Sequence, residues 1–403
     1  MTKITDIPAI RFKGFSDTWE QRKLGEIGSV SMCRRIFKEQ TSENGEIPFY
    51  KIGTFGGEAD AFISRELFEE YKAKYQYPKK GDILISASGS IGRTVVFTGK
   101  NEYFQDSNIV WLNHDKHLDN SFLKCFYSIV KWAGIEGSTI KRLYNDNILN
   151  TAITLPSVEE QQKIGAYFEN LDNLITLHQR KYDKLTNVKK SMLEKMFPQN
   201  GSNAPEIRFK GFTEAWEQRK LSEITDKVTE KNAGLQYVET FTNSAEFGII
   251  SQRDFFDHDI AKLGSLDGYY IVKNEDFVYN PRISTSAPVG PINRNKLGRT
   301  GVMSPLYTVF RPHDIDTTYL EYFFKCGYWH SFMNFNGDSG ARSDRFSIRD
   351  NVFFQMPIPI PDIDEQRKIG ELLTCLDNLI TLHQRELEKL KNLKKACLEK
   401  MFV

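Results

Sequence analysis

The sequence lacks the features that mark a membrane protein, a secreted protein or a polycation. Among its 403 residues there is no run of about 18 apolar residues to span a membrane, and its start has no apolar signal core. The five cysteines have no CxxC spacing, which predicts reduced thiols in a cytoplasmic protein. The formal net charge is +1, so charge alone does not indicate a nucleic-acid-binding chain.

The sequence also lacks a catalytic constellation. The glycine-rich residues 89–94 miss the lysine and spacing of a phosphate-binding loop, and there is no GxGxxG and no Asn-Pro-Pro-aromatic tetrapeptide. His114 and His117 stand in a polar segment without further ligands, which is more typical of a solvated loop than of a metal site. We therefore expect no catalytic residue, no metal site and no cofactor in this chain.

What the sequence does contain is a long internal repeat. Residues 171–180 and 376–385 are identical (LDNLITLHQR), and residues 10–27 closely match residues 207–224. The bodies between these matches, about 28–155 and 225–360, differ strongly. The repeated segments, which we call the frame, are therefore expected to have the same role in both halves of the chain. The two bodies are expected to perform different versions of one other function.

Residues 159–197 and 365–402 are each predicted to form one long helix. Their apolar residues recur in steps of four and three, an average of 3.5, which is typical of a coiled-coil seam. Each helix would be about 55–60 Å long, and neither can bury its seam alone, so we expect the two to pack on each other. The predicted seam comprises Ile164, Phe168, Leu171, Ile175, Tyr182, Leu185, Met192 and Met196 in the first copy, and Ile369, Leu373, Leu376, Ile380, Leu387, Leu390, Cys397 and Met401 in the second, with His178, Lys189, His383 and Lys394 in the gaps.

Both helix starts carry capping signals. Ser157 and Glu160 fit a capping box, in which the serine oxygen accepts a backbone N–H and the glutamate reaches back to the cap residue. Asp362 and Glu365 fit the same device with an aspartate cap.

Each body reads as a small α+β domain with a mixed sheet. Strands are expected near residues 47–53, 80–86, 94–97 and 108–112 in the first body, and near 247–253, 274–280 and 306–310 in the second. One short helix is expected in each, at 120–132 and 317–332. The resulting domains are residues 1–155, the first helix 156–198, residues 199–360 with a flexible linker at their start, and the second helix 361–403.

The loops of the bodies are rich in side chains suited to DNA. Arginine reads guanine edges through two hydrogen bonds, and hydroxyl and cationic groups bind phosphates. Basic residues of the second body also include Arg294, Lys296 and Arg299. The candidate DNA-binding residues are Arg34, Arg35, Lys38, Ser88, Ser90, Arg93, Lys141 and Arg142 in the first body, and Arg253, Arg282, Ser284, Thr285, Arg342 and Arg345 in the second.

Taken in order, these segments resemble the specificity subunits of type I restriction–modification systems over essentially the whole chain. We call the repeated residues 10–27 and 207–224 the lead-in segments. The resemblance is carried by the sequence WEQRKL within them, at Trp19 and Trp216, and by KGDIL from Lys80 with GSIGR from Gly89. It is clearest in LPSVEEQ from Leu155 and IPDIDEQ from Ile360, each of which opens a long helix. One departure is the second body's NPRIST segment from Asn280, which replaces the GSIG form.

The resemblance implies two target recognition domains that each read one half of a bipartite DNA site. It implies that the two helices form an antiparallel coiled coil that spaces these domains, with a pseudo-two-fold repeat that would bring His178 and His383 close together and the chain ends near each other. The implied partners are double-stranded DNA, two modification subunits that methylate adenine with S-adenosylmethionine, and two restriction subunits that use ATP and Mg²⁺. The alternative is a coiled-coil scaffold carrying two protein-binding domains. An affinity for DNA that falls steeply with salt concentration would argue against this alternative.

Overall fold

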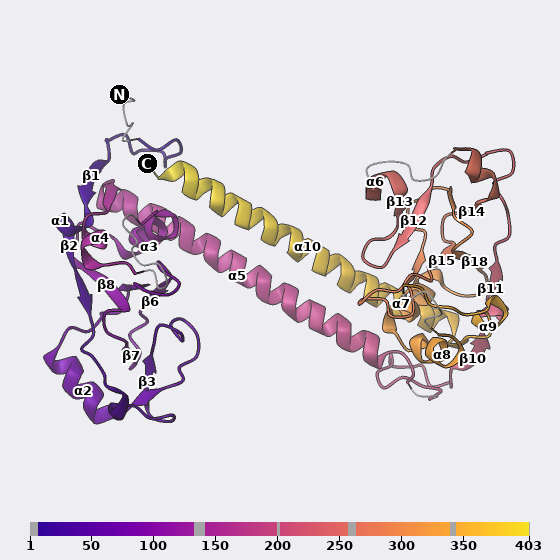
Figure 1. The fold of residues 1–403 in the computed structure, drawn as a ribbon, viewed down its shortest axis with the longest axis horizontal. Helices are drawn as coiled ribbons and strands as arrows, with labels where there is room; N and C mark the ends of the chain where they lie inside the picture. The colour runs from indigo at the N-terminus through magenta and orange to yellow at the C-terminus, as the bar shows by residue number, and fades with distance from the viewer. Residues whose placement is uncertain (1–6, 133–141, 200–201, 257–262, 339–343, 403) are drawn as a thin grey trace. The chain divides into compact units, whose positions relative to one another are not determined.

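The computed structural model describes residues 7–132, 142–199, 202–256, 263–338 and 344–402. The chain divides into two compact units, residues 1–179 with 384–403 and residues 180–383. Each unit holds one body and parts of both long helices, α5 (Val158–Lys195) and α10 (Ile363–Met401) (Figure 1). In the part of the chain that is described, no helix combines the length and the apolar character needed to cross a membrane.

The first unit is built on a four-stranded antiparallel sheet in the order β2-β8-β5-β6. A smaller sheet, β4-β3-β7, is mixed, because β3 pairs antiparallel with β4 and parallel with β7. The predicted mixed α+β body is therefore confirmed. Its strands are β1 (Glu20–Lys23), β2 (Gly28–Met32), β3 (Ile47–Tyr50), β4 (Phe62–Ile63), β5 (Ile83–Ser86), β6 (Thr94–Val96), β7 (Tyr103–Phe104), β8 (Ile109–His114) and β9 (Ala152–Leu155), and its shorter helices are α1 (Leu24–Ile27), α2 (Arg65–Lys74), α3 (Asn120–Ile129) and α4 (Asn145–Leu149).

The second unit repeats this plan with a four-stranded antiparallel sheet in the order β11-β18-β15-β16. Two separate antiparallel pairs, β12 with β13 and β14 with β17, stand in place of the smaller sheet. Its strands are β10 (Glu217–Lys220), β11 (Thr225–Lys227), β12 (Phe241–Ser244), β13 (Gly248–Ser251), β14 (Tyr270–Val272), β15 (Phe277–Tyr279), β16 (Ile292–Arg294), β17 (Gly301–Met303), β18 (Thr308–Pro312) and β19 (Pro357–Ile360), and its shorter helices are α6 (Gln252–Phe256), α7 (Thr317–Cys326), α8 (Trp329–Asn336) and α9 (Asp350–Phe353).

One prediction for the second body was wrong. A single helix was expected at 317–332, but α7 ends at Cys326 and α8 begins at Trp329. Gly327 separates them in the left-handed conformation, with φ of 79°. A glycine in this conformation ends a helix readily because it has no Cβ to clash with the preceding carbonyl.

The lead-in segment of each body closes a two-stranded ribbon with the strand just before the long helix. In the first unit β1 pairs with β9, and in the second β10 pairs with β19. Trp19 and Trp216 stand at the start of these ribbons and are both about 3% exposed. Trp19 packs edge-on against Phe402 at the end of α10, and Trp216 packs in the same way against Phe197 at the end of α5. Each indole therefore anchors the ribbon to the end of a long helix.

The two long helices run antiparallel within each unit. In the first unit Tyr167 meets Cys397, and Lys394 forms an ion pair of 2.6 Å with Asp172. In the second unit Lys189 forms the corresponding ion pair with Asp377. The lysines that interrupt the apolar seam are thus paired with aspartates of the identical LDNLITLHQR segments.

The apolar seam is most deeply buried toward the helix ends, where the bodies also cover it. Ile164 and Phe168 join the core of the first unit, and Ile369 and Leu373 join that of the second. The expected proximity of His178 and His383 involves one residue from each unit, and it stays a prediction.

The capping box was only half right. Ser157 does accept the N–H of Glu160 at 3.3 Å. The Glu160 carboxylate does not reach back to the cap; it accepts two hydrogen bonds from the Arg11 guanidinium, at 2.7 and 2.8 Å. Glu160 is fully buried and the Arg11 side chain is 11% exposed. The helix start is therefore held by a buried ion pair with the lead-in segment.

The second copy reproduces this arrangement. Asp362 caps α10 by accepting the N–H of Asp364 at 2.8 Å. The carboxylate of Glu365 accepts two hydrogen bonds of 2.8 Å from Arg208 and is itself fully buried. The same pair at equivalent positions of the repeat indicates a constraint on the frame itself.

The residue after each glutamate ties the long helix to its body. The Gln161 amide accepts the N–H of Asp119 at 2.8 Å and donates to the carbonyls of His117 and Pro156. Gln366 accepts the N–H of Asp316 at 2.9 Å and donates to Pro361. These aspartates are the N-caps of α3 and α7, so the glutamines join two helix starts in each unit.

The chain ends lie together, as expected from the repeat. The N–H of Ile10 donates to the Lys400 carbonyl near the end of α10, at 2.9 Å. In the second unit the N–H of Ile207 donates to the Lys195 carbonyl at the end of α5, also at 2.9 Å. The first contact brings the start of the chain against its end.

We expect Arg11→Ala to destabilise the first unit by about 3–5 kcal/mol, because it leaves a buried carboxylate without its partner. Arg208→Ala should do the same to the second unit. Hydrogen–deuterium exchange, read by mass spectrometry, should show faster exchange at the start of α5 for the first variant and at the start of α10 for the second.

The exposed Lys13 and Lys210 provide matched controls, because each lies two residues from the arginine in the same lead-in segment. Their change to alanine should leave exchange at both helix starts as in the parent protein. Equal exchange in the arginine and lysine variants would contradict a structural role for the buried pairs.

Candidate nucleic-acid interface

Strand register places three loops of the first body at one edge of its main sheet. Met32 at the end of β2 pairs with Val110, Ser86 at the end of β5 pairs with Ile109, and Thr94 at the start of β6 pairs with Ile85. The loops that follow β2 and β5 and the loop that precedes β8 therefore leave the sheet together. We call this the loop edge; the opposite edge leads into α3 and the long helix and is called the frame edge.

The segment before α4 completes the loop edge of the first body. Ala87 donates its N–H to the Asn108 carbonyl at 2.7 Å, and Leu143 donates to the Ala87 carbonyl at 2.8 Å. The hydroxyl of Ser88 donates to the Asn108 side chain at 2.8 Å. The structure thus brings together the loop 87–93, the loop 105–108 and the segment 142–144.

Two predicted arginines of the first body lie on this edge. Arg142 donates to the Ser107 carbonyl at 3.2 Å, and its guanidinium stands 5.9 Å from the centre of the Tyr144 ring. Arg93 is exposed, and a Cβ placed on Gly56 would come within 3.1 Å of its guanidinium, so Arg93 lies against the loop that follows β3. Ser90 is exposed on the same loop as Arg93, whereas Ser88 is buried.

The cluster at Arg34, Arg35 and Lys38 follows β2 at the same edge, and all three residues are exposed. Arg34 lies 5.2 Å from the ring centre of Tyr75, and Arg35 lies 5.6 Å from that of Phe37. Stacking on aromatic rings holds these guanidinium groups while leaving them open to solvent.

The second body has the same loop edge. Lys227 at the end of β11 pairs with Phe310, and Thr308 at the start of β18 pairs with Tyr279 at the end of β15. Arg282 and Arg345 form an antiparallel bridge, at the position where the first body has the bridge between Ser88 and Arg142.

The bridge of the second body is closed by backbone hydrogen bonds. The N–H of Phe346 donates to the Pro281 carbonyl at 2.8 Å, and that of Ile283 donates to the Asp344 carbonyl at 3.0 Å. The Arg282 side chain is 73% exposed, and its guanidinium lies 4.0 Å from the carboxylate of Asp344. Ser284 and Thr285 are exposed on the same loop.

The other candidates are placed differently. Arg253 is exposed in α6, after the β12–β13 hairpin, which adjoins the loop edge where Asn280 donates to the Asn243 carbonyl at 2.8 Å. Lys141 and Arg342 lie outside the described residues.

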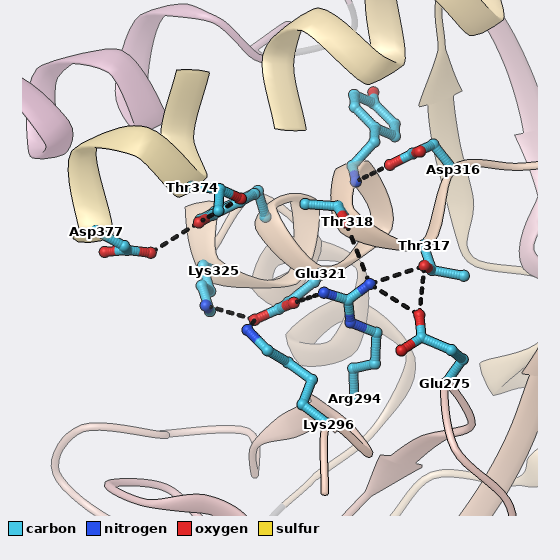
Figure 2. Close-up of polar contacts among 12 residues, drawn as sticks. Glu275, Arg294, Lys296, Asp316, Thr317, Thr318, Glu321, Lys325, Thr374 and Asp377 are labelled. Carbon is cyan, nitrogen blue, oxygen red and sulfur yellow. Dashed lines mark hydrogen bonds and ion pairs between the residues drawn. The ribbon is translucent and has the colours of Figure 1, made fainter. Parts of the chain in front are cut away.

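Arg294, Lys296 and Arg299 were grouped with the loop arginines by composition. Arg294 is the last residue of β16 and the other two follow it, so all three lie at the frame edge. Figure 2 shows Arg294 held among α7 side chains. Its guanidinium contacts Glu321 at 2.6 Å, Glu275 at 3.0 Å and the Thr317 hydroxyl at 2.7 Å, and its side chain is 9% exposed. Arg294 therefore joins the sheet to α7 and is not free to contact DNA.

The neighbouring cations are also engaged. Burial alone would raise the pKa of Glu321, but the Lys325 ammonium, with Arg294 and Lys296, holds that pKa below its ordinary value. Arg299 donates two hydrogen bonds to Glu239, at 2.7 and 2.8 Å, and these bonds lower the pKa of the Glu239 carboxyl. Both carboxylates therefore stay ionised beside their cations.

Sequence reasoning missed one loop at the loop edge of each body. Residues 105–108 precede β8 and residues 305–307 precede β18, and both adjoin the arginine-bearing segments described above. Neither loop is strongly basic, so composition gave no signal. Counting strands could have found them, because successive connections in an antiparallel sheet alternate between its two edges.

No group of three or more His, Cys, Asp or Glu side chains that could hold a metal ion is found among the described residues. His114 hydrogen-bonds through its two ring nitrogens to the Asp115 carbonyl and the Asn120 side chain, each at 2.8 Å. His117 pairs with the Asp115 carboxylate at 2.9 Å.

Comparison with known proteins gives a consistent result for both halves of the chain. The family model for the type I restriction modification DNA specificity domain matches residues 16–187 and again residues 213–392. A putative type I restriction enzyme specificity subunit of Haemophilus influenzae is 60% identical over 158 residues, which are 38% of this chain and 41% of that protein. The type I restriction enzyme MjaVIII specificity subunit of Methanocaldococcus jannaschii is 26% identical over 330 residues, which are 78% of this chain and 74% of that protein.

A solved structure shares the fold. The type I restriction–modification S subunit of M. genitalium has a TM-score of 0.55 and 15% identity, with 98% of this chain and 99% of that chain covered. The family model covers most of the sequence in two copies, one for each body with its helix. The chain therefore belongs to the family of type I restriction modification DNA specificity proteins.

Proposed function

We propose that this chain directs a type I restriction–modification enzyme to a bipartite site in double-stranded DNA, with one half of the site read by each body. The observation that carries the proposal is the repeated loop edge. Two bodies of unlike sequence present polar and basic loops at the same edge of the same sheet, on a near-identical frame. Loops that vary on a constant scaffold suit recognition of two different sequences.

The proposed role of the frame is to fix the separation of the two half-sites. The helices α5 and α10 run unbroken through 38 and 39 residues, and a helix of this length is a stiff spacer. The chemistry would rest with partners: two modification subunits using S-adenosylmethionine and two restriction subunits using ATP and Mg²⁺. This chain would contribute recognition and no catalytic group.

Exchanging residues 28–155 for the corresponding body of another family member should change one half-site and leave the other as it was. The reason is that the body meets the frame through repeated contacts, such as the β1–β9 ribbon, which lie outside the loop edge. The measurement is sequencing of the DNA methylated by the chain together with its modification subunit.

The reciprocal exchange of residues 225–360 is the matched control, and it should change only the second half-site. Simultaneous change of both half-sites in either chimera would contradict independent reading. Binding to DNA that is insensitive to both sequence and salt would favour a scaffold protein over a specificity subunit.

Arg93→Ala, Arg142→Ala and Arg282→Ala should each weaken specific binding. A guanidinium that reads a guanine edge contributes about 1–3 kcal/mol, and its loss relaxes one base position. A guanidinium on a phosphate would instead give a uniform loss of affinity and a shallower salt dependence. Titrations at several salt concentrations with single-base variants of the site separate the two cases.

Arg299→Ala is the control for these variants, because Arg299 follows the frame edge of β16 and is paired with Glu239. An exposed ion pair of this kind contributes about 0–1 kcal/mol to stability, and DNA binding should be unaffected. If the three loop arginine variants bind like Arg299→Ala, the loop edge is not the DNA-binding surface.

The frame also offers a repeated surface for two copies of the modification subunit. Leu174 and Leu177 on α5 are 43% and 46% exposed, and their repeats Leu379 and Leu382 on α10 are 38% and 51% exposed. These leucines belong to the identical LDNLITLHQR segments. Packing of the two helices does not require apolar residues at exposed positions, so helix packing alone does not account for these leucines. We propose that each pair contacts one modification subunit.

Changing Leu174 and Leu177 together to glutamate should remove one of two bound modification subunits, because buried carboxylates would oppose docking. The Leu379 and Leu382 double variant should lose the other copy. Native mass spectrometry measures the number of modification subunits bound to each variant. Leu393→Glu is the control: it is 42% exposed on α10, and its repeat position is Val188. Retention of two copies by both double variants would exclude this surface.

A further inference from the structure

A cleft of about 450 Å³ opens at the loop edge of the second body. Its walls come from the end of β15 with Pro281, the loop 305–307 before β18, and the segment that starts at Arg345. Its volume lies in the range of about 300–1,000 Å³ that is typical of ligand-binding clefts. The cleft therefore adjoins the bridge between Arg282 and Arg345, both of which the sequence predicts to bind DNA.

The lining of the cleft combines aromatic rings with polar and charged side chains. Tyr279 is buried and donates its hydroxyl to the Val289 carbonyl at 2.9 Å. The hydroxyl of Tyr307 lies 3.3 Å from that of Thr242, which fixes the ring against β12. Leu306 is 59% exposed at the rim. Rigid rings and an exposed leucine give a firm wall beside which the edge of a base can lie.

Arg345 supplies the cleft's uncompensated charge. Two other charged residues line the cleft, and they form an ion pair with each other, Lys227 with Asp350. For Arg345, no ion pair or side-chain hydrogen bond is found with any residue in the described ranges, and the residue is half-buried. A half-buried guanidinium without a protein acceptor is suited to an acceptor on a ligand.

At the equivalent place in the first body, the loop and the arginine are joined by hydrogen bonds. There Arg142 donates to the Ser107 carbonyl, and Asn108 accepts from Ser88, so the loop before β8 is drawn onto the arginine segment. The described contacts of Arg142 and Arg345 therefore differ between the two bodies, and any specificity that the cleft provides belongs to one half-site.

We propose that this cleft receives a guanine edge of the second half-site, with Arg345 donating two hydrogen bonds to it and Leu306 packing beside it. This inference rests on the proposed function. It adds the loop 305–307 to the recognition surface and assigns one base. Arginine paired with the O6 and N7 acceptors of guanine is the commonest specific contact in the major groove.

The test uses the full chain with its modification subunit and a DNA library randomised at every position of both half-sites. Sequencing of the methylated products gives the preference at each position. In Arg345→Ala, the preference for guanine at one position of the second half-site should fall about tenfold. In Arg345→Gln, the preference at that position should move toward adenine, which glutamine reads through N6 and N7.

Leu306→Ala should weaken preference at the same or the adjacent position, whereas Val238→Ala, an exposed apolar residue elsewhere in the second body, should change nothing. Circular dichroism melting establishes that each variant is folded. The first half-site should keep its sequence in every variant.

Two results would overturn the inference. One is an unchanged second half-site in folded Arg345→Ala. The other is a uniform loss of affinity with a shallower salt dependence, because that describes a phosphate contact. Failure of the proposed function would look different, since the unaltered chain with its partner would then methylate no bipartite sequence.

Discussion

The buried arginine–glutamate pair is the interaction on which each half of this protein depends. Arg11 with Glu160, and Arg208 with Glu365, join a lead-in segment to the first turn of a long helix about 150 residues further along the chain. The carboxylates are fully buried, so each is tolerated only while its arginine is in place. Because the pair fixes where the helix begins relative to the ribbon, it also fixes where the body's sheet is attached.

A body attached in this way can vary its loops without disturbing the frame. The frame edge of each sheet carries the contacts to α3 or α7, including the Arg294 network in the second unit. Among the described residues, the connections at the loop edge leave the opposite strand ends from the Arg294 network, since antiparallel register separates the two sets of connections by the length of the strands. Sequence change at one edge is therefore compatible with constancy at the other.

Much of the fold was predictable because its signals are local or repeated. The 3.5-residue spacing gave both long helices to within two residues at each end, and runs of strand-forming residues bounded by turn residues gave β5, β6 and β15. The candidate arginines of the 87–93 and 280–287 loops were also found by composition. The Arg11–Glu160 pair was missed because the capping box explains Glu160 locally, and only the repeat of both residues in a second copy hinted at another partner.

The sequence by itself determined the duplicated frame, the helices and the division into two unlike bodies, because periodicity, capping residues and internal identity do not depend on distant contacts. Tertiary structure alone decided which basic residues face outward. Arg282 and Arg294 are twelve residues apart in one basic stretch, yet one is 73% exposed at the loop edge and the other is held by Glu275 and Glu321 at the frame edge. The physical reason is strand pairing, because register sets the edge at which each residue emerges. Arg294 is then held between two carboxylates, whereas the Arg282 side chain remains largely exposed to solvent.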